Sequence, residues 1–174
     1  MSERPGDVTH KGRPLTVIGD KLKPGDNAPD FEVATGLFSL EIFTLADTGP
    51  KVRVFNVVPS LNTRICDIQT RRFNEELAQY GEKVEGYTIS VDLPVAQANW
   101  CSASGVDRLK MLSDYRSMSF GNAYGTHVKE VRVEQRSIFI VDAGGIIRYV
   151  EYVPEISQHP NYEAALAALK EVVG

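Results

Sequence analysis

Residues 52–80 constrain the fold more than any other part of the chain, because they combine a buried strand, a loop and a helix that begins next to a cysteine. Residues 52–58 are rich in β-branched and aromatic side chains, and Pro59 ends the run, which predicts a buried strand. After the loop, Cys66 begins a series of positions at helical spacing that continues with Thr70, Phe73 and Leu77. We therefore expect a strand-loop-helix unit in which the cysteine sulfur points into the protein.

Thr63 precedes Cys66 at the spacing at which the hydroxyl of an N-cap residue reaches the backbone N–H of helix position N3. This spacing predicts that Cys66 lies in the first helical turn. Unpaired amides and the helix macrodipole favour the thiolate there, which is the nucleophilic form. The alternative is that Cys66 is a small buried apolar residue and Thr63 is an ordinary helix cap.

The length of 174 residues predicts one domain, residues 1–174, with residues 1–19 as an N-terminal hairpin extension. A net charge of −4 provides no basic surface for nucleic acid. No apolar run approaches the roughly 20 residues of a membrane span, and the N-terminal segment lacks the apolar core of a signal peptide. We expect a soluble, cytoplasmic protein that binds neither nucleic acid nor a membrane.

Cysteine and histidine are scarce and dispersed in the sequence. Two cysteines, Cys66 and Cys101, are too few for a secreted fold held together by disulfides. The three histidines form no ligand pair at helical or zinc-knuckle spacing, so we expect no metal site. In a cytosolic protein the cysteine pair is either incidental or redox-active.

The other predicted elements alternate between strands and helices. In chain order they are edge strands at residues 31–33 and 38–40, a core strand at 87–91, a helix that starts at Pro94 and stops at Gly105, a short strand at 110–112, a short helix from 113 to 124, a long strand at 134–142, a hairpin partner at 146–150 and a final helix capped by Asn161. This order predicts an α/β fold in which the helices that follow parallel strands begin at the same edge of the sheet.

Cys101 lies in the predicted helix after the second core strand, so its sulfur can belong to the same neighbourhood as that of Cys66. A direct disulfide requires Cα atoms within about 7 Å, so one or both helices would have to unwind locally. The alternative is an isolated, buried Cys101 beside Trp100.

Arg136 opens an otherwise apolar strand, and a cation there must find an anion or reach water. Pairing with a thiolate is one solution, and a side chain that snorkels to the surface is the other. Arg71 is a second candidate to assist a thiolate. We favour instead a solvated helix face on which Arg72 and Glu76 form an ion pair at the i, i+4 interval.

Together these segments resemble the peroxiredoxins, and in particular their thiol peroxidase branch, the atypical two-cysteine type. Residues 59–66 match the pattern of the peroxidatic loop, which is Pro, three residues, Thr, two residues and Cys. Residues 90–101 resemble the helix with the resolving cysteine in that branch, and Arg136 matches the family's active-site arginine. The similarity covers nearly the whole chain, so it implies a thioredoxin-like fold: a central mixed β-sheet flanked by helices, with an N-terminal β-hairpin.

The resemblance implies a thiol-specific peroxidase that reduces hydrogen peroxide and organic hydroperoxides to water and alcohols in antioxidant defence. Cys66 would form a sulfenic acid, Cys101 would resolve it as an intramolecular disulfide, and a thioredoxin-like reductant would restore both thiols. Thr63 would hold thiolate and peroxide together, Arg136 would stabilise the reacting oxygens, and Pro59 would shield the sulfenic acid. The resemblance also implies a homodimer and no metal, haem or flavin cofactor.

Two positions depart from the family pattern. Asn62 stands where the family usually has Asp, and Arg64 stands where it usually has a small residue or Pro. Both changes make the field near Cys66 more positive, which favours the thiolate. Alternatively, Arg64 alters the rim of the pocket or a dimer contact. In that case substrate preference or assembly would differ from those of the family.

Three other functions would use the same residues differently. In a redox sensor, Cys66 and Cys101 would switch a binding surface, and turnover would be incidental. A non-catalytic thioredoxin-fold module would keep only the core, and the joint presence of Thr63, Cys66 and Arg136 argues against it. A cysteine hydrolase fits least, because no histidine falls near either cysteine in the predicted layout.

Overall fold

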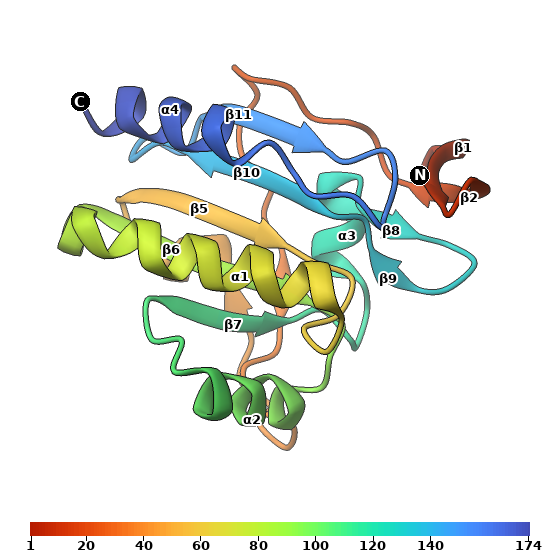
Figure 1. Ribbon diagram of the computed structural model, residues 1–174, viewed down its shortest axis with the longest axis horizontal. Coiled ribbons are helices and arrows are strands. Elements are labelled where there is room, and N and C mark those ends of the chain that lie inside the picture. The colour runs from red at the N-terminus through yellow and green to blue at the C-terminus, as the bar shows by residue number, and fades with distance from the viewer.

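The computed structural model describes residues Met1–Gly174 and is built around a central five-stranded sheet (Figure 1). Its strand order is β11-β10-β5-β6-β7, formed by β5 (Val52–Val57), β6 (Val84–Ser90), β7 (Leu109–Ser113), β10 (Ser137–Val141) and β11 (Ile147–Tyr152). β6 pairs in parallel with β5 and β7, whereas β10 pairs antiparallel with β5 and β11. The predicted α/β architecture with a central mixed sheet is confirmed.

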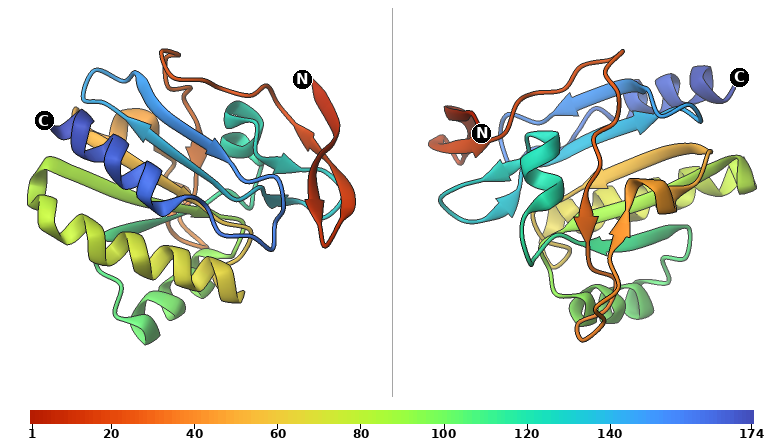
Figure 2. Two further views of the ribbon diagram at one scale, coloured as in Figure 1. Left: turned by 45° about the horizontal axis from the view of Figure 1, so that its top comes forward. Right: turned by 180° about the vertical axis from the view of Figure 1, so that it is seen from behind.

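Helices cover both faces of this sheet (Figure 2). α1 (Arg64–Leu77) and α4 (Tyr162–Val173) lie side by side on one face, and α3 (Ser119–Tyr124) lies on the other. Because side chains alternate along a strand, Val54 of β5 packs in the core under α1 and α4, whereas Phe55 packs in the core under α3. Two short 3-10 helices, η1 (Leu45–Thr48) and η2 (Ala78–Lys83), precede β5 and β6.

α1 begins directly after the loop that follows β5, as the sequence predicts. Thr63 is its N-cap residue, and Arg64 is its first helical residue. The inward-facing side chains are Cys66, Gln69, Thr70, Phe73 and Leu77, all of them buried. The sulfur of Cys66 therefore points into the protein, as predicted.

α2 (Pro94–Ser104) carries the second cysteine and packs against β7 at the sheet edge. It starts at Pro94 and stops at Gly105, as predicted, because Gly105 adopts a left-handed φ of 72° and donates its N–H to the carbonyl of Cys101. At the end of the chain, the predicted cap of α4 is also present, since Asn161 Oδ1 accepts the N–H of Ala164 at 3.0 Å. None of the helices combines the length and apolarity that a bilayer crossing needs.

The N-terminal hairpin consists of β1 (Glu3–His10) and β2 (Arg13–Ile18). Its tip is formed by Lys11 and Gly12, whose φ angles of 49° and 80° are left-handed. The hairpin belongs to a second sheet with the order β1-β2-β8-β9, which β8 (His127–Val128) and β9 (Val133–Glu134) complete. This sheet has a small core of its own, made of Val8, Leu15, Val17 and Val128.

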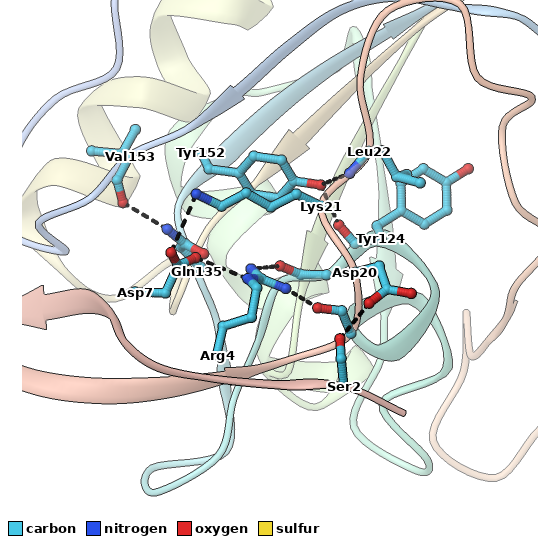
Figure 3. A network of polar contacts seen from close by, with 12 residues as sticks. Ser2, Arg4, Asp7, Asp20, Lys21, Leu22, Tyr124, Gln135, Tyr152 and Val153 are labelled. Atoms are coloured by element: carbon cyan, nitrogen blue, oxygen red, sulfur yellow. Dashed lines mark hydrogen bonds and ion pairs between the residues drawn. The ribbon is translucent and has the colours of Figure 1, made fainter.

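A polar network fixes the hairpin to the central sheet (Figure 3). The guanidinium of Arg4 pairs with Asp7 at 3.0 Å and donates to the carbonyl of Gly125 at 2.9 Å. Lys21 pairs with the same Asp7 at 3.3 Å, and its ammonium lies 5.6 Å from the centre of the Tyr152 ring. Because Tyr152 belongs to β11, the network joins β1 to the central sheet.

The predicted edge strand at residues 38–40 is wrong. β3 (Glu32–Val33) pairs instead with β4 (Phe43–Thr44), and the chain between them is a loop in which Phe38 and Leu40 are each 92% exposed. Ala34 exchanges both of its backbone hydrogen bonds with Ser113 at the edge of the central sheet. That edge is therefore occupied before the chain reaches residue 38, and an alternating triplet is too short to form a strand without a partner.

The predicted helix over residues 113–124 is correct only in its second half. Met118 adopts a left-handed φ of 54°, which interrupts any helix that started earlier. The carboxylate of Asp114 accepts the N–H groups of the two residues that follow Ser119. Asp114 thus satisfies the amides of the first turn from outside the helix, as an N-cap residue would.

The predicted strand over residues 134–142 is split in two. β9 ends at Glu134, and β10 begins at Ser137. In the gap, Gln135 donates its backbone N–H to the carbonyl of Thr126, which directly precedes β8 of the second sheet. The carbonyl of Arg136 instead accepts the N–H of Val153, which directly follows β11 of the central sheet. The chain crosses from one sheet to the other at this point, and Arg136 lies at the crossing.

Candidate active site

Cys66 occupies the third position of α1, and its sulfur contacts two polar groups although the side chain is 0% exposed. The hydroxyl of Thr63 lies 2.8 Å from Sγ, and Nη1 of Arg136 lies 3.5 Å from it. The structure therefore brings together the three residues on which the predicted chemistry depends. A hydroxyl and a guanidinium are hydrogen-bond donors, which suit a thiolate better than a thiol.

The hydroxyl of Thr63 does not cap the helix, contrary to the prediction. Thr63 has the extended backbone of an N-cap residue, but its side chain makes no cap hydrogen bond. Its Oγ1 lies 2.8 Å from the carbonyl of Ser60 as well as from the sulfur. A hydroxyl has one proton, so it either donates to a thiolate, or donates to Ser60 while it accepts the S–H of a thiol. Thr63 can thus support both protonation states of Cys66.

Arg136 is only 2% exposed, so it does not snorkel to the surface. Its Nε and Nη2 both donate to the carbonyl of Ile156, at 3.2 and 2.8 Å, and its Nη1 donates to Oε1 of Gln69 at 3.0 Å. No carboxylate forms an ion pair with it. Because this buried guanidinium has no acidic partner, Sγ of Cys66 is the nearby side-chain atom at which it can stabilise negative charge.

Gln69 connects Arg136 to a buried polar relay that sequence reasoning missed. Nε2 of Gln69 donates to Oδ1 of Asn56 at 2.6 Å, and Nδ2 of Asn56 donates to the hydroxyls of Thr70 and Thr88 at 3.0 and 3.1 Å. Two signals were present in the sequence, a lone amide in the middle of an apolar strand and a second amide on the apolar face of the helix. Asn56 presents only its acceptor oxygen to Gln69, so the NH₂ group of Gln69 must face Asn56. The amide oxygen of Gln69 is thereby directed toward Arg136.

Asp92 holds the loop between Pro59 and Thr63. Its carboxylate accepts hydrogen bonds from the hydroxyl of Ser60 at 2.7 Å and from the backbone N–H of Leu61 at 2.9 Å. Because Asp92 follows β6, the loop after β5 is fastened to the neighbouring strand.

Cys101 is half-buried in α2, and both cysteines are free thiols in the structure. Burial raises the pKa of the Cys101 thiol, which favours its neutral form. The side chain packs against the same apolar core that contains Cys66 and Trp100. Both cysteines thus contribute to one apolar core, and Cys101 lies inside an intact helix.

Arg71 pairs with Asp67 at 2.9 Å and makes no contact with Cys66, so the solvated alternative is correct. The predicted pair between Arg72 and Glu76 is also present, at 3.0 Å. No group of three or more histidine, cysteine or acidic side chains is placed to hold a metal ion.

A cavity of about 520 Å³ is lined by Thr63 and Arg136, the two residues that contact the buried sulfur of Cys66. Its lining residues are Pro59, Thr63, Arg64, Ile65, Arg136, Ile156, Ser157 and, from the tip of the N-terminal hairpin, His10 and Lys11. Sequence analysis gave the hairpin no functional role, because nothing local to it indicates which part of the fold its tip approaches.

The chain is similar to known proteins in sequence and in fold. Residues 24–150 match the model of the AhpC/TSA family. The thiol peroxidase of Bacillus subtilis (strain 168) is 52% identical over 167 residues, which cover 96% of this chain and 98% of that protein. The thiol peroxidase of Listeria monocytogenes serovar 1/2a is 51% identical over 164 residues, which cover 94% of this chain and 98% of the relative.

Solved structures agree with these relatives. A crystal structure of a peroxiredoxin-like protein from Aquifex aeolicus matches with a TM-score of 0.85 and 34% identity, covering 97% of this chain and 99% of the other. A thiol peroxidase from Chromobacterium violaceum shares the fold, with a TM-score of 0.81 at 20% identity over 94% of this chain and 95% of that one. The resemblance to the thiol peroxidase branch of the peroxiredoxins is thereby confirmed, and the protein belongs to the AhpC/TSA family.

Proposed function

We propose that this protein is a thiol peroxidase that reduces hydrogen peroxide and organic hydroperoxides through Cys66. The observation that carries the proposal is the pair of donors at a buried sulfur, Thr63 at 2.8 Å and Arg136 at 3.5 Å. Relatives named thiol peroxidase at about half identity over nearly the full chain support the same activity.

The first step is attack of the Cys66 thiolate on one peroxide oxygen. A sulfur–oxygen bond forms, the oxygen–oxygen bond breaks, and the departing oxygen takes a proton and leaves as water or an alcohol. Cys66 is oxidised to a sulfenic acid, and the peroxide is reduced. Arg136 and Thr63 donate to the reacting atoms, and because Arg136 is already held by Ile156 and Gln69, it need not reorganise as charge develops.

The second step uses Cys101 of the same chain. Its thiol attacks the sulfur of the Cys66 sulfenic acid, a disulfide forms and water leaves. Because Cys101 lies inside α2 and is half-buried, the step requires local unwinding of that helix. A thioredoxin-like dithiol then reduces the disulfide, and its own two sulfurs are oxidised.

Pro59 lines the cavity beside the sulfur, and we assign to it the shielding of the sulfenic acid from water. We also propose that the protein acts as a homodimer, as its family resemblance implies. Light scattering on the purified chain tests this assembly, and a monomer at working concentration would contradict it.

Peroxide consumption with thioredoxin recycling tests the function in wild type, Cys66→Ser and Cys101→Ser. We expect wild type to turn over many times, Cys66→Ser to be inactive, and Cys101→Ser to complete a single turnover that thioredoxin does not recycle. Undiminished activity of Cys66→Ser would overturn the proposal. A single slow oxidation of wild type without turnover would favour the redox-sensor alternative instead.

A further inference from the structure

Two cations without partners lie at the rim of the cavity next to Cys66. Lys11 comes from the tip of the hairpin, and Arg64 is the first residue of α1. Both side chains are exposed, and neither forms an ion pair. Most other arginines at comparable exposure are paired or hydrogen-bonded, as Arg71 is with Asp67. The charges of Lys11 and Arg64 are therefore available to attract an anionic ligand that enters the cavity.

No acidic residue lines the cavity. The acid beside the hairpin is Glu155, whose carboxylate accepts hydrogen bonds from the hydroxyl of Thr9 and the N–H of Gly12, each at 3.0 Å, and from the N–H of Ser157 at 2.8 Å. Asp67, one helical turn after Arg64, is engaged by Arg71 and by the indole of Trp100. Asp67 is paired with Arg71, whereas Glu155 has only neutral donors and keeps its negative charge. Lys11 and Arg64 together outweigh that one carboxylate, so the rim keeps a net positive charge.

The wall between the rim and the sulfur is partly apolar. Pro59, Ile65 and Ile156 line it, and Thr63 and Arg136 stand at the reactive end. The lining thus combines two donors that contact the Cys66 sulfur, apolar carbon from Pro59, Ile65 and Ile156, and the exposed positive charges of Lys11 and Arg64. A ligand that matches all three carries a hydroperoxide, an apolar stem and an anion.

We propose that Lys11 and Arg64 select organic hydroperoxides that carry a carboxylate or another anionic group away from the peroxide. This inference rests on the proposed peroxidase function and names its preferred substrate class. The anionic group stays chemically unchanged, because only the oxygen–oxygen bond is reduced. Hydrogen peroxide and neutral hydroperoxides react at the same sulfur, but their reaction rates are not increased by attraction to Lys11 and Arg64. An exposed charge pair in the middle of the usual range changes an affinity by about 1.7- to 3.2-fold, so two cations that act independently should change selectivity by roughly 3- to 10-fold.

The test compares para-carboxycumene hydroperoxide with its methyl ester, which differ in charge but share the peroxide and the stem. The second-order rate of Cys66 oxidation is measured for each by stopped-flow fluorescence of Trp100, the only tryptophan of the chain. The variants are Lys11→Gln, Arg64→Gln and the double variant. Lys170→Gln, which removes an exposed cation from α4, is the matched control. The ratio of acid to ester rates cancels any effect of Arg64 on the reactivity or folding of Cys66.

We expect wild type and Lys170→Gln to prefer the acid by about 3- to 10-fold, each single variant to lose part of that preference, and the double variant to show a ratio near one. Added salt should lower the wild-type ratio as well. Equal rates for acid and ester in wild type, or an unchanged ratio in the double variant, would overturn the inference while leaving the peroxidase function intact. If Cys66 of wild type were oxidised neither by these two hydroperoxides nor by hydrogen peroxide, the peroxidase function itself would fail.

Discussion

The indole Nε1 of Trp100 donates a hydrogen bond to Oδ1 of Asp67 at 3.0 Å, and this bond joins α2, which carries Cys101, to α1, which carries Cys66. Arg71 reinforces the junction. Its Nε pairs with the same Asp67 at 2.9 Å, its guanidinium lies 5.6 Å from the centre of the Trp100 ring, and its Nη1 donates to the carbonyl of Ser104 at 3.3 Å. These contacts hold α2 folded, whereas the proposed disulfide requires it to unwind.

Replacing Trp100 by Phe should therefore accelerate disulfide formation. The substitution removes the N–H and keeps an aromatic ring in the core. Loss of a hydrogen bond to a charged acceptor, worth about 1 kcal/mol or more, should speed the resolving step roughly 3- to 10-fold. Rapid quenching followed by mass spectrometry after one equivalent of peroxide measures this step. The rate of sulfenic acid formation should stay within about 2-fold of wild type. If disulfide formation is no faster than in wild type, the hydrogen bond from Trp100 to Asp67 does not hold α2 folded against the resolving step.

Replacing Gln69 by Glu should slow the reaction of Cys66 with peroxide. The new carboxylate would face Arg136, pair with its charge and compete with the thiolate, and we expect a loss of about 10-fold or more. Gln79→Glu adds the same charge at an exposed position and is the control. The second-order rate with hydrogen peroxide distinguishes the two, and equal rates in both variants would show that Gln69 does not position Arg136.

The resolving step should depend on pH in a direction set by the burial of Cys101. Burial raises the pKa of this thiol in the folded helix, so the thiolate is disfavoured while α2 is folded and deprotonation favours unwinding. The rate of disulfide formation should consequently rise with pH through the ordinary thiol value of about 8.5 and level off only above it. Single-turnover measurements on preformed sulfenic acid give this profile. A plateau below the ordinary thiol value would contradict the assignment.

Stability should change with pH through Glu134, which is fully buried near Asp114. Burial raises the pKa of Glu134 well above its ordinary value, and the Asp114 carboxyl raises it further. Protonated Glu134 therefore contributes to the stability of the folded protein. This contribution is complete below the ordinary carboxyl pKa of about 4.3 and is lost as the pH rises through the raised pKa of Glu134.

Glu134→Gln should abolish this dependence. The amide oxygen can still accept the bond from Thr126, and the free energy of unfolding at neutral pH should rise by roughly 1 to 3 kcal/mol. Urea unfolding across pH measures it, with the exposed Glu75→Gln as control. A stability profile of Glu134→Gln parallel to that of wild type would exclude Glu134 as the titrating group.

The features that sequence analysis predicted correctly depend on near neighbours. The start of α2 at Pro94, its stop at Gly105 and the cap of α4 at Asn161 each involve contacts within about one turn. The predictions were wrong where contacts with a segment distant in the sequence determine the local structure. The strand over residues 134–142 breaks because the chain crosses there from one sheet to the other. Cys66 lies in the first turn after Thr63 as predicted, but the Thr63 hydroxyl contacts the sulfur and the carbonyl of Ser60 and not the backbone N–H that an N-cap side chain accepts.

The sequence by itself determined the alternation of strands and helices and the place of Cys66 in the first turn of α1, because these follow from periodicity and short-range hydrogen bonding. The peroxide chemistry was implied by the resemblance of residues 59–66 and Arg136 to the peroxiredoxins. Only the tertiary structure decided what surrounds the sulfur. The Ile156 carbonyl that orients Arg136, the amide relay through Gln69 and the hairpin tip with Lys11 all come from segments far apart in the chain. Their meeting depends on sheet pairing and core packing, which act on the whole fold and leave no local pattern to read.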